Sequence, residues 1–156
     1  MAGIVASEEC KIFRIISPKD IAGGALTGDY FDMSGHAHAT IIVTCGAVTN
    51  SATLTVSENT TNVGGSADLI DFKYAQELTD AGDVLGALAW VGATTGIATG
   101  TENNTIHVIE IDGAQLSDGH NWVTLLTSNA GANFISAIAI LSGSRYAGSE
   151  NASVQG

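Results

Sequence analysis

Residues 52–56 read Ala52-Thr53-Leu54-Thr55-Val56, a strict alternation of apolar and hydroxyl-bearing side chains. Because successive side chains of a β-strand point to opposite faces, the three apolar residues would share one face and the two threonines the other. One apolar face and one polar face are typical of a strand that lies between a core and solvent. The stretch therefore predicts a sheet with one buried face.

Similar short runs, rich in Val, Ile and Thr, recur along the chain and are separated by Gly, Asn, Asp and Ser. Turn residues at intervals of roughly a dozen positions are typical of β-sandwiches and barrels. Helix signals are weak, because Gly82 and Gly86 interrupt the candidate segment 78–88. The runs predict strands at 11–17, 29–33, 39–45, 52–57, 69–75, 85–91, 105–111, 122–127 and 134–141.

The expected fold class is all-β, a single-domain β-sandwich or jelly roll with extended terminal arms. A chain of 156 residues suits one domain. We expect an N-terminal arm and first strand at 1–20, the sandwich at 21–148 and a C-terminal arm at 149–156. Pro18 is expected to end the first strand, because proline lacks a backbone N–H.

The last predicted strand carries apolar side chains on both of its faces, from Ile135 to Leu141. Strands buried on both faces read as nearly continuous apolar runs. We therefore expect a central strand, covered on one side by its own sheet partner and on the other by another layer or subunit.

Charged residues are few and strongly biased toward acid. They make up 13% of the chain, and the formal net charge is −11. From Asp20 onward there are 14 carboxylates and two cations, a local net charge of −12. Nucleic-acid binding depends on cations that displace counterions from phosphates, so we expect no nucleic-acid partner. We also expect no membrane association, since no stretch approaches the roughly 18 apolar residues of a membrane span and no secretory signal is evident.

Three of the five cations, Lys11, Arg14 and Lys19, lie within the first 19 residues. Lys11 and Arg14 flank a strand that is otherwise Ile and Phe, and Lys19 follows Pro18. Such a segment could dock on an acidic partner surface, where charge complementarity sets orientation and association rate. We take these three residues as the candidate partner-docking residues. The alternative interpretation is that they only balance the acidic body.

No constellation of residues predicts a catalytic site, so we expect no enzyme and no cofactor. The Gly-rich stretch 23–28 lacks the Gly-Lys-Ser/Thr ending of a phosphate-binding loop and is interpreted as a turn. We expect no metal site; the candidates are His36 and His38, whose spacing would put two imidazoles on one face of a strand. Their alternative role is that of solvated loop residues.

Four stretches together resemble a known group of proteins. They are Gly24-Ala25-Leu26-Thr27-Gly28-Asp29-Tyr30-Phe31-Asp32-Met33, residues 39–48, the run 105–111 with its Val-Ile-Glu-Ile-Asp, and the closing residues 134–147. This pattern, which spans about residues 21–147, resembles small virion proteins of tailed bacteriophages. The resemblance implies a head decoration (cement) protein that forms homotrimers, binds the major capsid protein on the outside of the head and stabilises the capsid lattice. It would be located in the virion, after assembly in the host bacterial cytoplasm.

Two other functions stay open at this point. A tail-tube or head–tail connector subunit could use an acidic lumen to let DNA slide by repulsion. A carbohydrate- or receptor-binding module on the virion surface would need exposed aromatic side chains, and the candidates are Tyr30, Tyr74, Trp90, Trp122 and Tyr146.

Overall fold

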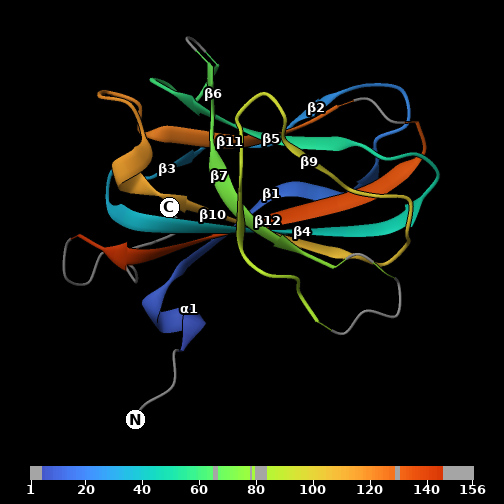
Figure 1. The fold of residues 1–156 in the computed structure, drawn as a ribbon. Coiled ribbons are helices and arrows are strands. Elements are labelled where there is room, and N and C mark those ends of the chain that lie inside the picture. The colour runs from blue at the N-terminus through green and yellow to red at the C-terminus, as the bar shows by residue number, and fades with distance from the viewer. Residues whose placement is uncertain (1–4, 65–66, 78, 80–83, 129–130, 146–156) are drawn as a thin grey trace.

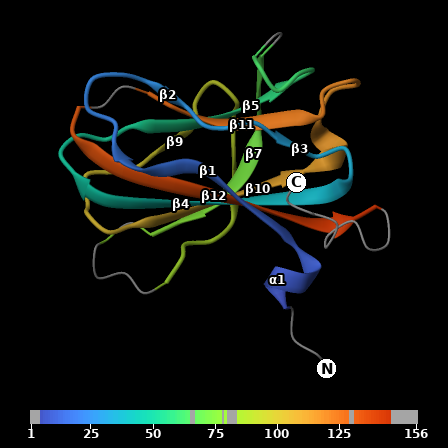
Figure 2. The ribbon, with the colours of Figure 1, turned by 180° about the vertical axis from the view of Figure 1, so that it is seen from behind.

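The protein is a sandwich of two antiparallel six-stranded sheets, as the sequence predicts (Figure 1). The computed structural model describes residues 5–64, 67–77, 79, 84–128 and 131–145. The two layers lie one above the other in both views (Figures 1 and 2), and their inner faces enclose a single core. The expected all-β fold class is therefore confirmed.

Sheet A contains the longest strands of the fold. Their spatial order is β1 (Lys11–Asp20), β12 (Asn133–Ser144), β4 (His36–Val48), β10 (Ile106–Asp112), β7 (Phe72–Gln76) and β8 (Ala89–Val91). The strand β12 thus lies between β1 and β4, in agreement with its expected central position.

Sheet B is built around β5 and β11. Its order is β2 (Leu26–Thr27), β11 (Trp122–Thr127), β5 (Thr53–Asn59) and β6 (Asp68–Ile70), while β3 (Phe31–Asp32) also pairs with β11 and β9 (Ile97–Ala98) with β5. Two short helical segments complete the described elements, α1 (Ala6–Glu9) and the 3₁₀ turn η1 (Gly113–Gln115). Among the described residues, no helix has the length and apolarity needed to cross a membrane.

The core follows the alternation seen in the sequence. Ala52, Leu54 and Val56 are fully buried, whereas Thr53 and Thr55 on the other face of sheet B are half-buried. The largest fully buried apolar side chains come from both sheets: Met33, Ile41, Leu54, Phe72, Ile109, Ile111, Leu125, Ile135 and Leu141. Burial of apolar area, worth about 25 cal/mol per Å², is the main force that holds the two sheets together.

The expectation that Pro18 ends the first strand is wrong. The strand β1 continues to Asp20, and its pairing with β12 shifts register between Ile16 and Lys19. Proline is tolerated at such an irregularity on an edge strand, because the missing N–H leaves no ladder partner unsatisfied. The position of β1 at the edge of sheet A is what permits it, and the local sequence does not reveal that position.

Several strand boundaries also differ from the sequence-based ones. The run 69–75 is divided between β6 and β7, because the chain crosses from sheet B to sheet A at Asp71. The run 85–91 forms a strand only at Ala89–Val91, and 29–33 only at Phe31–Asp32. The two-residue strands β2 and β9 and the helix α1 are too short to leave a periodic signal. The proposed C-terminal arm, 149–156, lies outside the described residues.

Candidate docking surface

The face of sheet A that points away from the core is covered by no other layer of the described structure (Figures 1 and 2). We call it the outer face and define it by the residues that alternate with the buried ones on the strands of sheet A. They are Ile12, Arg14, His38, Thr40, Ile42, Thr44, Lys73, Ala75, Trp90, Ile106, Val108, Glu110, Asp112, Phe134, Ser136, Ile138 and Ile140.

An apolar row crosses the middle of this face. The strand registers place Arg14, Ile138, Ile42, Val108 and Ala75 side by side on β1, β12, β4, β10 and β7. Four of the five are apolar, although the positions face outward. The expected covering layer over β12 is therefore not supplied by another described part of this chain.

Three exposed apolar side chains of the outer face lie on β1 and β12, at the β1 edge of sheet A. Ile12 exposes 48% of its surface, Phe134 51% and Ile138 37%. Single exposed apolar residues are ordinary on protein surfaces, whereas several on one face of a sheet favour an interaction site. The side chains of this patch, Ile12, Phe134 and Ile138, lie on two paired strands of sheet A.

The three predicted docking residues lie along the β1 edge strand that borders the patch. Arg14 and Lys19 are exposed and Lys11 is half-buried, with its Nζ 5.0 Å from the centre of the Phe13 ring. Lys19 and Phe134 line the same shallow hollow of about 210 Å³. None of the three cations forms an ion pair with another described residue, so their charges are available to a partner.

The N-terminal segment leaves the body on the same side. The helix α1 lies below sheet A, on the side away from sheet B, in both ribbon views (Figures 1 and 2). None of its residues is buried, and it is joined to the sandwich through β1. The outer face, which includes Arg14, and the segment α1 therefore lie on the same side of the molecule. Lys11 alternates with Ile12 and Arg14, so it lies on the other side of β1.

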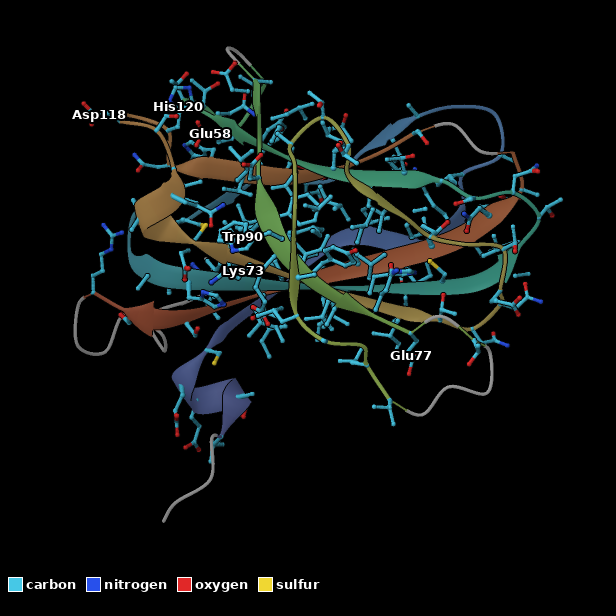
Figure 3. The ribbon with its side chains drawn as sticks, viewed as in Figure 1. Glu58, Lys73, Glu77, Trp90, Asp118 and His120 are labelled. Atoms are coloured by element: carbon cyan, nitrogen blue, oxygen red, sulfur yellow. The ribbon has the colours of Figure 1, made fainter. Side chains whose placement is uncertain are left out.

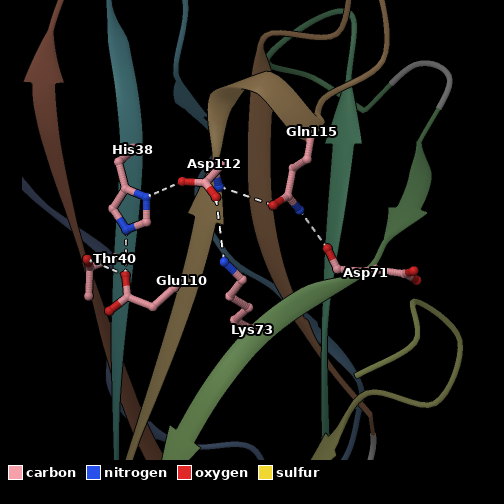
Figure 4. A network of polar contacts seen from close by, with 7 residues as sticks. All are labelled: His38, Thr40, Asp71, Lys73, Glu110, Asp112 and Gln115. Atoms are coloured by element: carbon pink, nitrogen blue, oxygen red, sulfur yellow. Dashed lines mark hydrogen bonds and ion pairs between the residues drawn. The ribbon is translucent and has the colours of Figure 1, made fainter. Parts of the chain in front are cut away.

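A polar network lies on the β4, β10 and β7 part of the outer face (Figure 4). The His38 ring forms hydrogen bonds with two carboxylates. Nδ1 lies 2.8 Å from Asp112 Oδ1, and Nε2 lies 2.7 Å from Glu110 Oε2. Thr40 Oγ1 donates to the same Glu110 oxygen at 2.7 Å, and Lys73 Nζ lies 3.9 Å from Asp112 Oδ2. Because ionised carboxylates only accept hydrogen bonds, this geometry favours the doubly protonated imidazolium.

The structure gives different surroundings to the two histidines named as metal candidates. His36 is buried, whereas His38 is half-exposed and both of its ring nitrogens face carboxylates. An imidazolium has no lone pair for a metal, so His38 in this network acts as a cation. Sequence reasoning missed Glu110 and Asp112 as its partners, although their alternation with buried Ile109 and Ile111 places both on the outer face.

The His38 network should stabilise the fold more at low than at high pH. Ring burial opposes protonation, but the hydrogen bonds to Glu110 and Asp112 outweigh it and raise the pKa of His38 above its usual 6.5. A base whose pKa is higher in the folded state stabilises fully below its unfolded-state pKa, and this contribution is lost as the pH rises through the folded-state pKa. The difference in unfolding free energy between the wild type and His38→Ala should therefore be largest below about pH 6.5 and shrink above it. Urea unfolding at closely spaced pH values measures this difference.

His107 supplies a control, because its pKa shift and its effect on the pH dependence of stability have the opposite sign. It is buried between Thr105 and Gln76, and burial lowers its pKa below 6.5. Its contribution is present above its unfolded-state pKa and is lost as the pH falls below that value. A wild-type-minus-His38→Ala difference that is constant with pH would contradict the role given to His38.

The exposed aromatic candidate on the outer face is Trp90, which exposes 61% of its surface (Figure 3). Lys73 Nζ lies 5.0 Å from the centre of its ring, a cation–π contact that covers one face of the indole. Tyr74 and Trp122 are half-buried, and Tyr146 lies outside the described residues. The face of Trp90 on which a sugar would stack is thus partly taken by Lys73.

Comparisons with known proteins identify no family for this chain. No family model and no curated protein matches the sequence. Among solved structures, the chain is similar to the crystal structure of the SPBc2 prophage-derived protein YomS, with a TM-score of 0.45 and 10% sequence identity over 86% of this chain and 94% of that one. A likeness at this level carries no conclusion about function.

Proposed function

We propose that this protein is a non-enzymatic decoration subunit of a tailed-phage head, which binds the outside of the assembled capsid and stabilises its lattice. The single observation that carries the proposal is the uncovered outer face of sheet A, where an apolar patch borders a basic edge strand. The occupant is the major capsid protein, contacted through an acidic surface, because Lys11, Arg14 and Lys19 have no ion-pair partner among the described residues of this chain.

The charge distribution supports an external position. Beyond residue 19 the chain carries a net charge of −12, which packaged DNA would repel. In this arrangement the acidic body faces solvent, the patch and Arg14 face the capsid, and Lys11 and Lys19 lie along the edge strand beside them. We further propose that the protein binds the capsid as a homotrimer, in which neighbouring copies bury one another's edge strands.

Stabilisation of the capsid lattice then follows from mass action. A protein that binds the assembled lattice and not the free subunits favours the lattice, by an amount that grows with its concentration relative to its Kd. Heads that lack this protein should therefore open at lower temperature, or on milder osmotic shock, than heads that carry it. Equal robustness of the two kinds of head would overturn the proposal.

The docking surface is tested with single substitutions. Phe134→Asp should reduce cosedimentation of the purified protein with undecorated heads by about tenfold or more, since burying a Phe side chain is worth about 1.5–3 kcal/mol. The matched control is Val63→Asp, which replaces a residue 80% exposed and outside sheet A. Equal binding of the two variants would show that the outer face does not contact the capsid.

A further inference from the structure

A buried carboxylate that has no Lys or Arg partner among the described residues lies in sheet B. Glu58, near the end of β5, exposes 2% of its surface, and its Oε2 accepts a hydrogen bond of 2.8 Å from the backbone N–H of Ser117. No described Lys or Arg forms an ion pair with it. A buried carboxylate is costly unless it is paired with a cation or coordinates a metal.

The strand pairing adds a second carboxylate directly beside it. Asp68 on β6 is the register partner of Glu58 on β5. Like charges opposite each other on neighbouring strands are destabilising. A bound cation would convert this repulsion into a bridge between the two strands.

The third side chain is His120, from the loop between η1 and β11. Its Nδ1 lies 3.3 Å from the backbone oxygen of Asp118, a hydrogen bond that places the ring proton on Nδ1 and the lone pair on Nε2. Nε2 is buried and has no hydrogen-bond partner, and it lies 3.7 Å from Asp68 Oδ2. A buried nitrogen without a hydrogen-bond partner beside a carboxylate points to an ion between them.

The geometry suits one ion. The ligand atoms of Glu58, Asp68 and His120 all lie within 4.8 Å of one another, and Figure 3 shows Glu58 and His120 side by side at the end of the sandwich. Two ligands of a tetrahedral Zn²⁺ ion are separated by roughly 3.3–3.5 Å, given bond lengths near 2.1 Å. Glu58 and Asp68 also line a hollow of about 500 Å³, which provides access and room for a water ligand.

We propose that Glu58, Asp68 and His120 bind one divalent transition-metal ion, with Zn²⁺ as the representative ion. Imidazole together with carboxylates suits Zn²⁺, whereas Ca²⁺ prefers oxygen ligands alone. Backbone groups of the loop orient both a carboxylate and the imidazole, as the outer shell of a metal site does. The ion would tie the edge strand β6 to the loop before β11.

Zinc binding to the metal-free full chain tests the proposal. In a Cys10→Ser background, which removes a partly exposed thiol, calorimetry with Zn²⁺ should give one site per chain. Loss of an outer-shell contact costs about 10–100-fold in affinity, so His120→Ala, which removes a direct ligand, should weaken binding by at least about a hundredfold. Free Zn²⁺ at about a hundred times its Kd should raise the Tm by roughly 5–10 °C in the parent and not in His120→Ala.

Two control variants separate the site from its surroundings. Asp118→Ala changes the same loop but keeps the backbone carbonyl, so its Zn²⁺ affinity should equal that of the parent. Glu58→Gln keeps the Ser117 contact and should weaken Zn²⁺ binding while the protein stays folded by circular dichroism. No saturable Zn²⁺ binding by the parent, equal binding by His120→Ala, or tighter binding of Ca²⁺ than of Zn²⁺ would each overturn the proposal.

Discussion

Replacing Gly96 by Ala should destabilise the protein by about 2–5 kcal/mol, the sum of backbone strain and overpacking. Gly96 has a φ of +61° and lies where the chain passes from β8 in sheet A to β9 in sheet B. A Cβ at this position would clash with the Leu54 carbonyl oxygen and lie 2.7 and 2.8 Å from the Cγ2 atoms of Thr55 and Thr53. Because the obstructing oxygen belongs to the backbone of β5, no side-chain rotation relieves the clash. Urea unfolding measures the change.

Gly100→Ala is the matched control for this prediction. Gly100 also has a positive φ, +77°, but the nearest atom to a built Cβ is 4.0 Å away. Only the strain of a left-handed conformation remains, about 1–2 kcal/mol. If the two alanine variants lose the same stability, the close approach of Gly96 to β5 is not a determinant of the fold.

Phe72→Ala should cost about 3–5 kcal/mol and lower the Tm by roughly 6–20 °C. Phe72 is fully buried at the start of β7, immediately after the chain leaves sheet B at Asp71. Its removal would leave a cavity that neighbouring residues on two sheets can fill only in part. A thermal melt followed by circular dichroism gives the shift.

The control for Phe72→Ala is the same Phe-to-Ala substitution on the outer face of sheet A. Phe134 exposes 51% of its surface, so Phe134→Ala should cost less than about 1 kcal/mol. Similar losses in the two variants would mean that the outer face is packed against something in the free protein. If Phe134→Ala loses little stability, reduced capsid binding by Phe134→Asp can be attributed to loss of docking and not to unfolding.

The role of the outer face depends on its separation from the core. The apolar row formed by Ile138, Ile42 and Val108 lies on strands whose inner faces are fully buried. Substitutions in the apolar patch should therefore act mainly on binding, and substitutions of core residues mainly on stability. Because patch and core are separate, the proposed docking function can be tested by mutation. The proposed docking requires no change in backbone conformation.

The metal proposal concerns a different region and is tested independently. Glu58, Asp68 and His120 belong to sheet B and the loop before β11, whereas the docking patch lies on β1 and β12 of sheet A. Loss of Zn²⁺ binding in His120→Ala would leave the patch intact. Failure of either experiment thus leaves the other proposal standing.

Local periodicity by itself determined most of the longer strands and their buried faces. The alternation at 52–56 predicted β5 and its core face, and the two apolar faces of Ile135–Leu141 predicted the central strand β12. These features follow from the period of two along a strand, which needs no knowledge of neighbours. The deficit of cations beyond residue 19 was equally visible, since charge is a property of composition.

Only the tertiary structure decided which segments meet. It placed β1 at an edge, where Pro18 fits, and left the outward apolar side of β12 uncovered by the described chain. It also joined Glu58, Asp68 and His120, because register and sheet crossing bring together positions far apart in sequence. Pairing of distant strands depends on packing across the whole core, and no local pattern of side chains specifies it.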